Sequence, residues 1–422
     1  MPRVIPFRGL RFHARHAAEM SRLAAPPYDV ISEQDRLRYE GLHPRNVVRL
    51  ILPGEAGRVE DGSFYAGAAA LLRKWQEEGT LELDPRPAFY PYRQTFMGPE
   101  GERAVRLGFL GSLALPPGQE GDNTVLPHET TLDGPRKDRT RLITACRANL
   151  SPVFLLHPDS TGRVETCLQD ATSDPPLFAF EDAAGVLHEL WKMEDTLKVA
   201  RLEEALLPDW SLIADGHHRY ESALAVRDSL PDEEGAGGVL AFFCSLRDRG
   251  FRVFPIHRLL RARGARAGSS NLAKILARQH VLEEIPSGAG PDQILGHLRR
   301  IGERCVAVVT PDAAPLVVRM VPADRTPGDP VEDLDTVLLQ REILTGVLGI
   351  SGEDVAGGAI GYTSDAVEAV RQVRSGEARA AFLLNPLKVE SVIRAAQAGR
   401  RLPQKSTYFY PKVYTGLVIR PF

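Results

Sequence analysis

The chain has 422 residues, of which 43% are hydrophobic and 25% are charged, and its formal net charge at pH 7 is −3. This length exceeds one typical hydrophobic core, so two or three domains are expected. The small negative charge excludes a general attraction to nucleic acid or to an anionic membrane. No apolar run approaches the ~18 residues of a membrane span, and residues 1–23 carry scattered charge, unlike a secretory signal. We therefore expect a cytoplasmic globular protein in which any site for an anion is local.

The first feature in chain order is a rigid loop over residues 25–31. Its two consecutive prolines force extended backbone and remove two hydrogen-bond donors, and Ser32 is a typical cap for the helix that follows. The loop presents Tyr28 and Asp29. Two interpretations stay open: the loop is a strap that holds the core, or it forms the rim of a site.

Hydrophobic periodicity predicts the regular elements. Apolar residues at helical spacing predict an amphipathic helix over 64–78, and strands at 88–95 and 106–115 around a Gly-Pro-Glu-Gly turn predict a hairpin. The strands up to residue 256 are expected to form one mixed sheet. The further elements are helix 135–147, strands 152–156 and 186–191, a helix before Pro208, strands 239–246 and 252–256, helices 271–279 and 291–301, strands 305–310 and 315–320, helix 332–348, strand 379–384 and helix 388–398.

A composition change predicts the domain division. Near residues 261–270, Gly, Ala, Arg and Ser replace the apolar pattern, which is typical of a linker. Helices and strands alternate after it, as in a smaller α/β domain. We expect an N-terminal extension packed on the core at 1–110, the core at 111–262, the smaller domain at 263–398 and a C-terminal segment at 399–422.

The most informative stretch is Asp215-Gly216-His217-His218-Arg219. An apolar strand ends at this acid and glycine, and a helical pattern begins at once. Helix N-termini bind anions, arginine is a bidentate donor to phosphate or carboxylate, and glycine lets a ligand approach the backbone. An ordinary cap and turn is the alternative interpretation, but one acid, two histidines and one arginine within five residues favour a ligand site.

Two further stretches carry chemistry. His128 and Glu129 lie in a short loop between prolines, before a helix rich in arginine, where an acid and a histidine could act as a base near bound phosphate. The alternative interpretation is that the charged side chains of this helix form only a solvent-exposed face. Near the C-terminal end of the sequence, Lys405, Ser406 and Thr407 could reach phosphate oxygens, unless the segment is a β-rich strap with a snorkelling lysine. The sequence contains neither a Walker-type phosphate loop nor a Gly-x-Gly-x-x-Gly fingerprint.

These motifs together resemble a known family. The run 215–219 resembles the signature of the ParB/sulfiredoxin-like superfamily. The order of Pro127-His128-Glu129, this run, and Pro403 with Lys405-Ser406-Thr407 is similar to that of the archaeal free L-serine kinase, over roughly residues 110–422, and the helix and strand in 367–384 agree. The whole chain also resembles an uncharacterised prokaryotic family, the domain-of-unknown-function family ten-fifteen.

The resemblance implies both a fold and an activity. The fold is α/β or α+β, with a ParB/sulfiredoxin-like mixed-sheet catalytic core, a smaller α/β C-terminal domain, and a last segment that returns to the active site. The activity is that of a small-molecule kinase, which transfers phosphate from an adenine nucleotide, ATP or ADP, to the hydroxyl of a small metabolite, first of all free L-serine. Such transfer relies on positioning and charge neutralisation, so no Walker loop is needed.

The resemblance also implies roles for individual residues. Glu129 would be the general base, and His128 would orient it or touch phosphate. Asp215 would hold Mg²⁺ or the acceptor amine, and Tyr28 and Asp29 would lie on the substrate rim. The nucleotide phosphates would be bound by Gly216, His217, His218, Arg219, Lys405, Ser406 and Thr407.

Two alternatives from other classes remain. A ParB-like switch would bind or hydrolyse nucleotide without phosphorylating a metabolite, but such proteins usually carry a basic helix-turn-helix domain, which the sequence does not predict. A metal-dependent hydrolase would use the three motif histidines, yet neither their spacing nor that of the four scattered cysteines is typical of a metal site. The expected partners are a small-molecule substrate and a nucleotide, without nucleic acid or membrane. The phosphate donor, the acceptor and the oligomeric state stay open.

Overall fold

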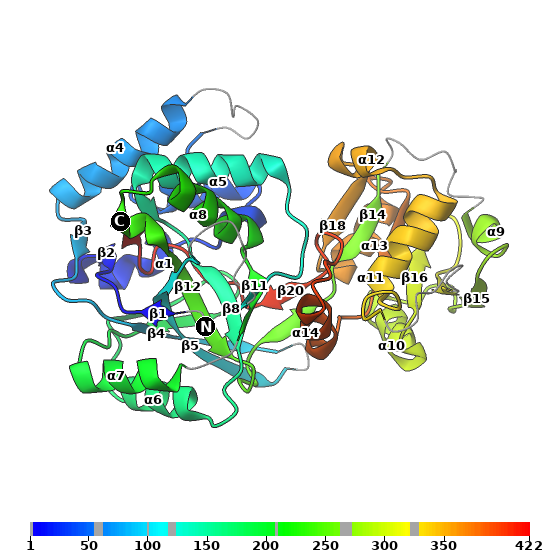
Figure 1. The fold of residues 1–422 in the computed structure, drawn as a ribbon. Helices are drawn as coiled ribbons and strands as arrows, with labels where there is room; N and C mark the ends of the chain where they lie inside the picture. Colours follow the sequence, from blue (N-terminus) through cyan, green and yellow to red (C-terminus); the bar gives the residue numbers. More distant parts are fainter. Residues whose placement is uncertain are drawn as a thin grey trace. The chain divides into compact units, whose positions relative to one another are not determined.

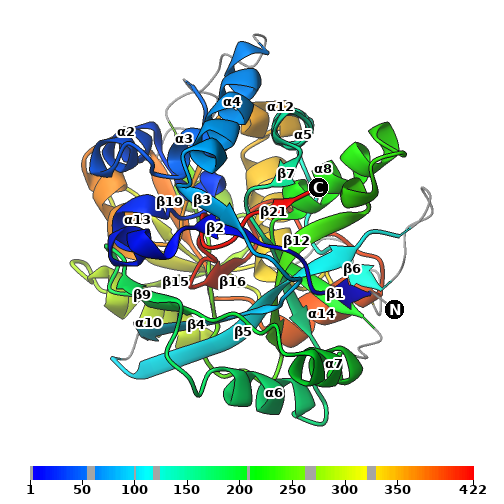
Figure 2. The same cartoon turned by 90° about the vertical axis from the view of Figure 1, so that its left-hand side faces the viewer.

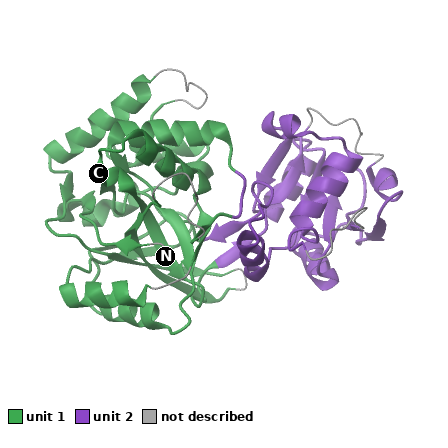
Figure 3. Ribbon diagram, viewed as in Figure 1, with its two compact units in different colours: residues 1–127, 131–251, 411–422 green, residues 128–130, 252–410 purple. Residues whose placement is uncertain are grey.

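The structure is a computed structural model that describes residues 3–54, 62–98, 101–116, 124–206, 210–261, 272–320 and 329–422. The chain forms two compact units (Figure 3). Unit 1 consists of residues 1–127, 131–251 and 411–422, and unit 2 consists of residues 128–130 and 252–410. Among the helices described, none has the length and apolar character needed to cross a membrane.

Unit 1 is built on a mixed nine-stranded sheet (Figures 1 and 2). The strand order is β6-β11-β8-β12-β5-β4-β10-β9, and β1 pairs with β5. β11 runs parallel to β6 and β8 runs parallel to β12, while the other pairs are antiparallel. The strands are β1 Val4–Ile5, β4 Tyr90–Met97, β5 Arg103–Ala114, β6 Val125–Leu126, β8 Val153–His157, β9 Phe178–Glu181, β10 Leu187–Leu190, β11 Ser211–Asp215 and β12 Gly238–Ser245.

The central strands of this sheet are buried on both faces. Every residue of β12 is buried, in keeping with its continuous apolar run. Alternate side chains point to opposite faces. Phe109 and Phe243 face one core, which α6, α7 and α8 share, whereas Phe154 and Phe242 pack together on the other face. The helices are α1 Met20–Leu23, α2 Glu33–Leu42, α3 Val48–Ile51, α4 Ser63–Glu77, α5 Asp133–Cys146, α6 Arg163–Ala171, α7 Thr196–Ala205 and α8 His217–Ser229.

Strand pairing ties part of the N-terminal region of unit 1 to this sheet. β4 and β5 form the predicted hairpin, and β5 also pairs with β12 along most of its length. Two short antiparallel pairs complete the unit: β2 (Leu10–Phe12) with β3 (Leu81–Leu83), and β7 (Ala148–Asn149) with β21 (Arg420–Pro421). The predicted cap at Ser32 is present as a full capping box with Asp35.

Unit 2 is a three-layer α/β unit. Its main sheet has six antiparallel strands in the order β15-β17-β16-β19-β14-β18. The alternation along β16 explains the layers, because Ala307 packs with α10 and α13 on one face, and Val306 packs with α9 and the helix 335–347 on the other. The elements are β14 His257–Leu260, α9 Leu272–Leu276, β15 Val281–Glu284, α10 Pro291–Ile301, β16 Cys305–Val309, β17 Leu316–Arg319, α11 Asp335–Leu338 continuing as a π-helix over Leu339–Val347, α12 Gly352–Ala356, β18 Ile360–Thr363, α13 Ala366–Arg374, β19 Ala380–Leu383 and α14 Val389–Gln397.

The predicted fold class, a mixed-sheet core with a smaller α/β domain, is confirmed. One strand assignment was wrong: β13 (Arg252–Phe254) does not join the large sheet but pairs with β20 (Tyr408–Tyr410) in unit 2. The ring of Phe254 stacks on that of Tyr408 and packs at a tilt against that of Tyr410, so side-chain packing favours this pairing. The predicted extension and core fall within one unit here, and the expected linker lies largely outside the described residues.

Candidate functional site

The turn that follows β11 places Asp215 at the end of a buried strand. Leu212, Ile213 and Ala214 are at most 4% exposed, so the strand is anchored in the core up to the acid. Gly216 then takes φ +91°, a left-handed conformation that suits glycine, and α8 begins at the next residue. A Cβ on Gly216 would also lie 2.8 Å from the Arg219 guanidinium. The glycine therefore allows the arginine to fold back over the turn.

The carboxylate of Asp215 is held between two cations. Its Oδ2 accepts from the Arg219 guanidinium, and its Oδ1 lies 2.5 Å from the Lys412 ammonium. The exposed fractions of the Asp215, Arg219 and Lys412 side chains are 14%, 6% and 9%. Arg219 also donates to the carbonyl oxygen of Pro152. We name Asp215, Arg219 and Lys412 the unit 1 cluster.

This cluster carries one more positive than negative charge at the N-terminus of a 13-residue helix. Both features favour an anion, because the first turn of a helix has unpaired N–H groups and a partial positive charge. Burial alone would lower the pKa of Arg219, but the charges of Asp215 and Asp29 outweigh it and raise that pKa. The Arg219 guanidinium therefore remains charged at neutral pH and can attract a phosphate or carboxylate.

The donor set around Asp215 does not fit the Mg²⁺ ion that the resemblance implies. Magnesium prefers oxygen ligands in octahedral geometry. Both carboxylate oxygens of Asp215 are instead engaged by cationic side chains, which would repel a metal ion. In the described part of the chain, no group of three or more His, Cys, Asp and Glu residues is arranged to hold a metal. The geometry makes Asp215 the residue that positions Arg219 and Lys412.

The two histidines of the motif differ in exposure, since His217 is buried and His218 is half-buried. His217 is 6% exposed. His218 accepts, through Nε2, a hydrogen bond of 2.9 Å from the backbone N–H of Leu132, the residue before α5. One turn further along α8, Glu221 accepts from the hydroxyl of Thr131. His218 therefore connects α8 to the start of α5 in this structure.

The predicted rim residues lie beside the unit 1 cluster. Tyr28 and Asp29 form a 3-10 turn, and the guanidinium of Arg139 lies 4.2 Å from the centre of the Tyr28 ring. Tyr28, Arg139 and Arg219 line one small cavity of about 20 Å³. Burial raises the pKa of the Tyr28 hydroxyl, so this hydroxyl stays protonated. The structure thus brings the N-terminal loop and the motif arginine together.

The other two motifs meet in unit 2. Leu402 donates its N–H to the carbonyl oxygen of His128 at 2.7 Å, and the side chain of Glu129 accepts the backbone N–H of Ser406 at 3.0 Å. His128 is completely buried, and its Nε2 lies 2.9 Å from the hydroxyl of Thr407. Residues 128–129 and 406–407 therefore form one hydrogen-bonded group. We name it, together with Lys405, the unit 2 cluster.

Lys405 has an exposed side chain and a strained backbone. Its φ of +57° is left-handed, which is unusual for a residue other than glycine. Arg258, which is 3% exposed, donates to the carbonyl oxygens of Lys405 and Gln404 at 2.9 and 3.3 Å. Burial lowers the pKa of Arg258 to about 10, so it is still charged at neutral pH. Arg258 and Glu129 together fix the backbone on both sides of the strained peptide.

Sequence reasoning missed two residues that organise these clusters, Lys412 and Arg258. Neither lies within a recognisable motif, and each contacts its partners across a long sequence separation, 197 residues for Lys412 and Asp215. The only local signal for Lys412 is its position a few residues after the predicted phosphate-binding group at 405–407.

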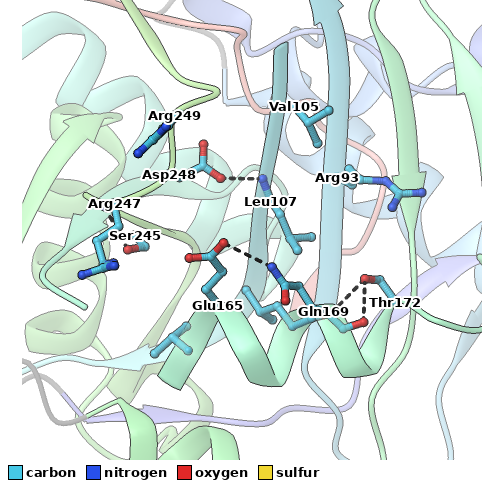
Figure 4. A pocket seen from close by; sticks show the side chains of 12 residues that line it. Arg93, Val105, Leu107, Glu165, Gln169, Thr172, Ser245, Arg247, Asp248 and Arg249 are labelled. Carbon is cyan, nitrogen blue, oxygen red and sulfur yellow. Dashed lines mark hydrogen bonds between the residues drawn. The ribbon is translucent and has the colours of Figure 1, made fainter. Parts of the chain in front are cut away.

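A separate cavity of about 960 Å³ lies in unit 1 and contains none of the predicted site residues (Figure 4). Its walls come from β4, β5, α6 and the loop after β12. The charged groups in it are already engaged by protein: Arg93 pairs with Glu189 at 2.7 Å, and Asp248 accepts the N–H of Leu107 at 2.9 Å. We assign no function to this cavity.

Comparison with known proteins gives a family match and remote structural likenesses. The family model described as "Protein of unknown function (DUF1015)" matches residues 4–336. No curated protein matches. A free serine kinase mutant in complex with AMP shares 15% identity with a TM-score of 0.37, covering 68% of this chain and 84% of that one.

Two further solved structures show the same level of likeness. A conserved hypothetical protein from Pyrococcus furiosus shares 16% identity with a TM-score of 0.36, covering 68% of this chain and 87% of that one. SbnI with a C-terminal truncation, from Staphylococcus aureus, shares 11% identity with a TM-score of 0.36, covering 73% and 86%. Scores this low carry no conclusion about activity.

Proposed function

The chain belongs to the DUF1015 family of proteins of unknown function. From the chemistry of its candidate site, we propose that the protein is a phosphotransferase. It transfers a phosphoryl group from an adenine nucleotide, ATP or ADP, to the hydroxyl of a small metabolite. Free L-serine is the first acceptor to test, because the motif order is similar to that of the free L-serine kinase. The observation that supports this function best is the half-buried carboxylate of Asp215, which lies between Arg219 and Lys412 at the start of α8.

The unit 1 cluster has the chemistry that phosphoryl transfer needs. Little covalent chemistry is required of the protein, and catalysis consists mostly of positioning and of neutralising charge on the phosphoryl oxygens. Arg219 and Lys412 supply two fixed positive charges, and the N–H groups at the start of α8 supply further donors. Asp215 holds both cations in place, so they need not be ordered when the nucleotide binds. Electrostatic preorganisation of this kind stabilises charge without reorganisation during the reaction.

The unit 2 cluster has a candidate for the base. In the proposed step, Glu129 takes the proton from the acceptor hydroxyl as that oxygen forms a bond to the transferred phosphorus. The bond between phosphorus and the leaving oxygen breaks, and the shortened nucleotide leaves with that oxygen. The N–H of Ser406 holds the Glu129 carboxylate in one orientation, and the exposed Lys405 is available to a phosphate oxygen. His128, buried against Thr407, orients this group. No step is assigned to Mg²⁺.

The test is to incubate the full chain with Mg²⁺, either nucleotide and a panel of amino acids and hydroxy acids, and to follow products by ³¹P NMR. We expect a phosphate ester with at least one acceptor. Lys412→Ala should reduce transfer strongly, whereas Lys388→Ala, which removes an exposed lysine paired with Glu303, is the matched control and should not. Nucleotide binding without any phosphorylated product would instead favour the ParB-like switch. No binding of either nucleotide would remove both functions.

A further inference from the structure

Arg106 is a fully buried cation whose hydrogen bonding is incomplete. Its exposed fraction is 0%, and it projects from β5 directly opposite Gln94 of β4. Nη2 donates to the Gln94 side-chain oxygen, but Nε and Nη1 have no partner among the described residues. The guanidinium lies 4.7 Å from the ring centre of Phe154 and 5.2 Å from that of Phe242. One N–H of Nε and two of Nη1 are therefore unpaired.

The charge of Arg106 also lacks a direct counter-ion. Burial lowers its pKa, yet a guanidinium stays protonated at neutral pH. Asp248 and Asp215 act on it electrostatically, and among the described residues no carboxylate forms an ion pair with it. Aromatic faces compensate only part of the cost of burying such a charge. Burying a cation without a counter-ion costs free energy. An anionic ligand that pairs with Arg106 would explain why this charge is retained in the core.

Three other buried arginines of the described chain have more hydrogen-bond acceptors than Arg106. Arg219 pairs with Asp215, and Arg258 donates to three carbonyl oxygens. Arg420, also in unit 1, donates through Nη1 to Asn149 at 3.2 Å and to the carbonyl oxygen of Gly238 at 3.0 Å. Arg106 is thus the member of this group that has a single neutral partner and two unpaired nitrogens.

Arg106 is connected to the unit 1 cluster through Gln94. The side-chain nitrogen of Gln94 donates to the backbone carbonyl oxygen of Lys412 at 2.9 Å, and its oxygen accepts from Arg106. These two bonds fix the orientation of the amide. Phe154, whose ring lies under Arg106, pairs in the sheet with Asp215. The unpaired N–H groups of Arg106 therefore belong to the same part of unit 1 as Lys412 and Asp215.

We propose that Arg106 is a binding residue for a compact oxyanion, either a carboxylate or a phosphoryl group, carried by the ligand of the unit 1 cluster. The oxyanion accepts from Nε or Nη1 and neutralises the buried charge. Gly108 leaves room for the Phe242 ring that lies against the guanidinium, because a Cβ on this residue would lie 2.5 Å from that ring. The assignment of this oxyanion to a phosphotransferase substrate rests on the proposed function. The binding itself does not.

The test compares Arg106→Met with Arg420→Met by thermal unfolding at constant ionic strength, titrating inorganic phosphate, acetate or ADP. Without these anions, Arg106→Met should melt at or above the wild-type temperature, because an apolar residue of similar length replaces an uncompensated charge. Phosphate or acetate should raise the melting temperature of wild type and not of Arg106→Met, and calorimetry should show about ten- to a hundredfold weaker binding. The responding anion identifies the group as phosphoryl or carboxylate.

Arg420→Met is the control for the loss of a buried arginine that has its partners. It should melt below wild type and keep the response to the anion. The inference is overturned if Arg106→Met melts lower and keeps the full response, or if wild type responds to none of the three anions. If Arg106→Met does not fold, Arg106→Lys decides: it keeps a positive charge over the rings but has no guanidinium N–H groups, so unchanged anion binding overturns the inference. If the Arg106 variants lose anion binding and the wild-type protein transfers no phosphate, the proposed function is refuted and Arg106 is still the anion ligand.

Discussion

The two clusters hold their carboxylates in different ways. In unit 1, Asp215 is balanced by the charged side chains of Arg219 and Lys412. In unit 2, Glu129 accepts a backbone N–H from Ser406, and Arg258 donates to backbone carbonyl oxygens. A network of buried charges depends on every member, because removing one leaves another uncompensated. Backbone groups stay in place when a side chain changes, so the unit 2 cluster should tolerate substitution without unfolding.

The largest effect expected from a substitution in either cluster is on the rate of phosphoryl transfer, and it concerns Glu129 in unit 2. Glu129→Gln keeps an oxygen that can accept from Ser406, but it cannot take a proton from an acceptor hydroxyl. We expect transfer to slow by about a hundred- to ten-thousand-fold, with nucleotide affinity and melting temperature nearly unchanged. Single-turnover transfer and calorimetry measure the two quantities. Transfer at close to the wild-type rate would remove Glu129 from the mechanism.

The next effect is on stability in unit 1. Asp215→Ala leaves Arg219 and Lys412 buried without their counter-ion, and should lower the free energy of unfolding by about 3–5 kcal/mol. Urea denaturation measures this loss. Asp29→Ala is the matched control, since this exposed acid should contribute about 1 kcal/mol or less. If Asp215→Ala lowers the free energy of unfolding by less than about 1 kcal/mol, the unit 1 cluster does not depend on its charge balance, and the contrast with unit 2 fails.

A third prediction concerns a second backbone-held carboxylate in unit 2. Asp335 is 6% exposed and accepts N–H groups from Arg304, at 2.6 Å, and from Cys305; burial raises its pKa to about 7. In the unfolded chain its pKa is near 3.9, so between about pH 4 and 7 the folded state binds the extra proton. This group therefore stabilises the fold at low pH, and that contribution falls as pH rises to 7, by at most about 1.4 kcal/mol per unit.

Asp335→Asn removes the titration and keeps an oxygen for the two N–H groups. The variant should gain stability relative to wild type as pH rises from 4.5 to 8, as measured by urea denaturation at both pH values. The same change at Asp333, which is 42% exposed and paired with Arg304, is the control for removing a charge nearby. An equal difference between Asp335→Asn and wild type at both pH values would contradict the raised pKa.

The smallest effect concerns the strain at Lys405. Glycine adopts a φ of +57° more easily than lysine, but it also increases the entropy of the unfolded chain. Lys405→Gly should therefore stabilise the protein by only about 0.5 kcal/mol, while weakening any phosphate contact that the lysine makes. A melting temperature above wild type together with reduced transfer would show that strain is retained for function. A clear loss of stability would indicate that the exposed lysine side chain has a structural role.

Local sequence patterns were enough to predict much of the fold. The capping box at Ser32, the hairpin of β4 and β5, and the strand–turn–helix around Asp215 each depend on residues close in sequence. The strand at 252–254 was assigned to the wrong sheet, because its partner at 408–410 lies more than 150 residues away and no local pattern identifies it. Pairing partners depend on tertiary packing, which periodicity does not encode.

Residue types in the sequence predicted which side chains form the candidate site, and their burial in the structure corrected how exposed these side chains are. Asp215 and Arg219 are partners, as their position in one motif suggested, but Arg219 is 5% exposed and does not face an open cleft. Lys412 and Arg106 could not be found from the sequence, because an isolated lysine or arginine gives no sign of its burial or partner. Sequence motifs identified the chemistry, and only the fold revealed which charges balance one another.

The division of unit 1 into three stretches has a consequence for biosynthesis. Residues 1–251 leave the ribosome before Lys412 is made, and the whole of 252–410 is translated in between. Until then, Asp215 lacks one of its two cations, and β7 lacks β21. Domains generally fold as units during translation, but closure of this 197-residue separation has to wait. Nascent unit 1 should therefore pass through a state that is sensitive to proteases and chaperones, and a piece consisting of residues 1–251 should not reproduce the native site.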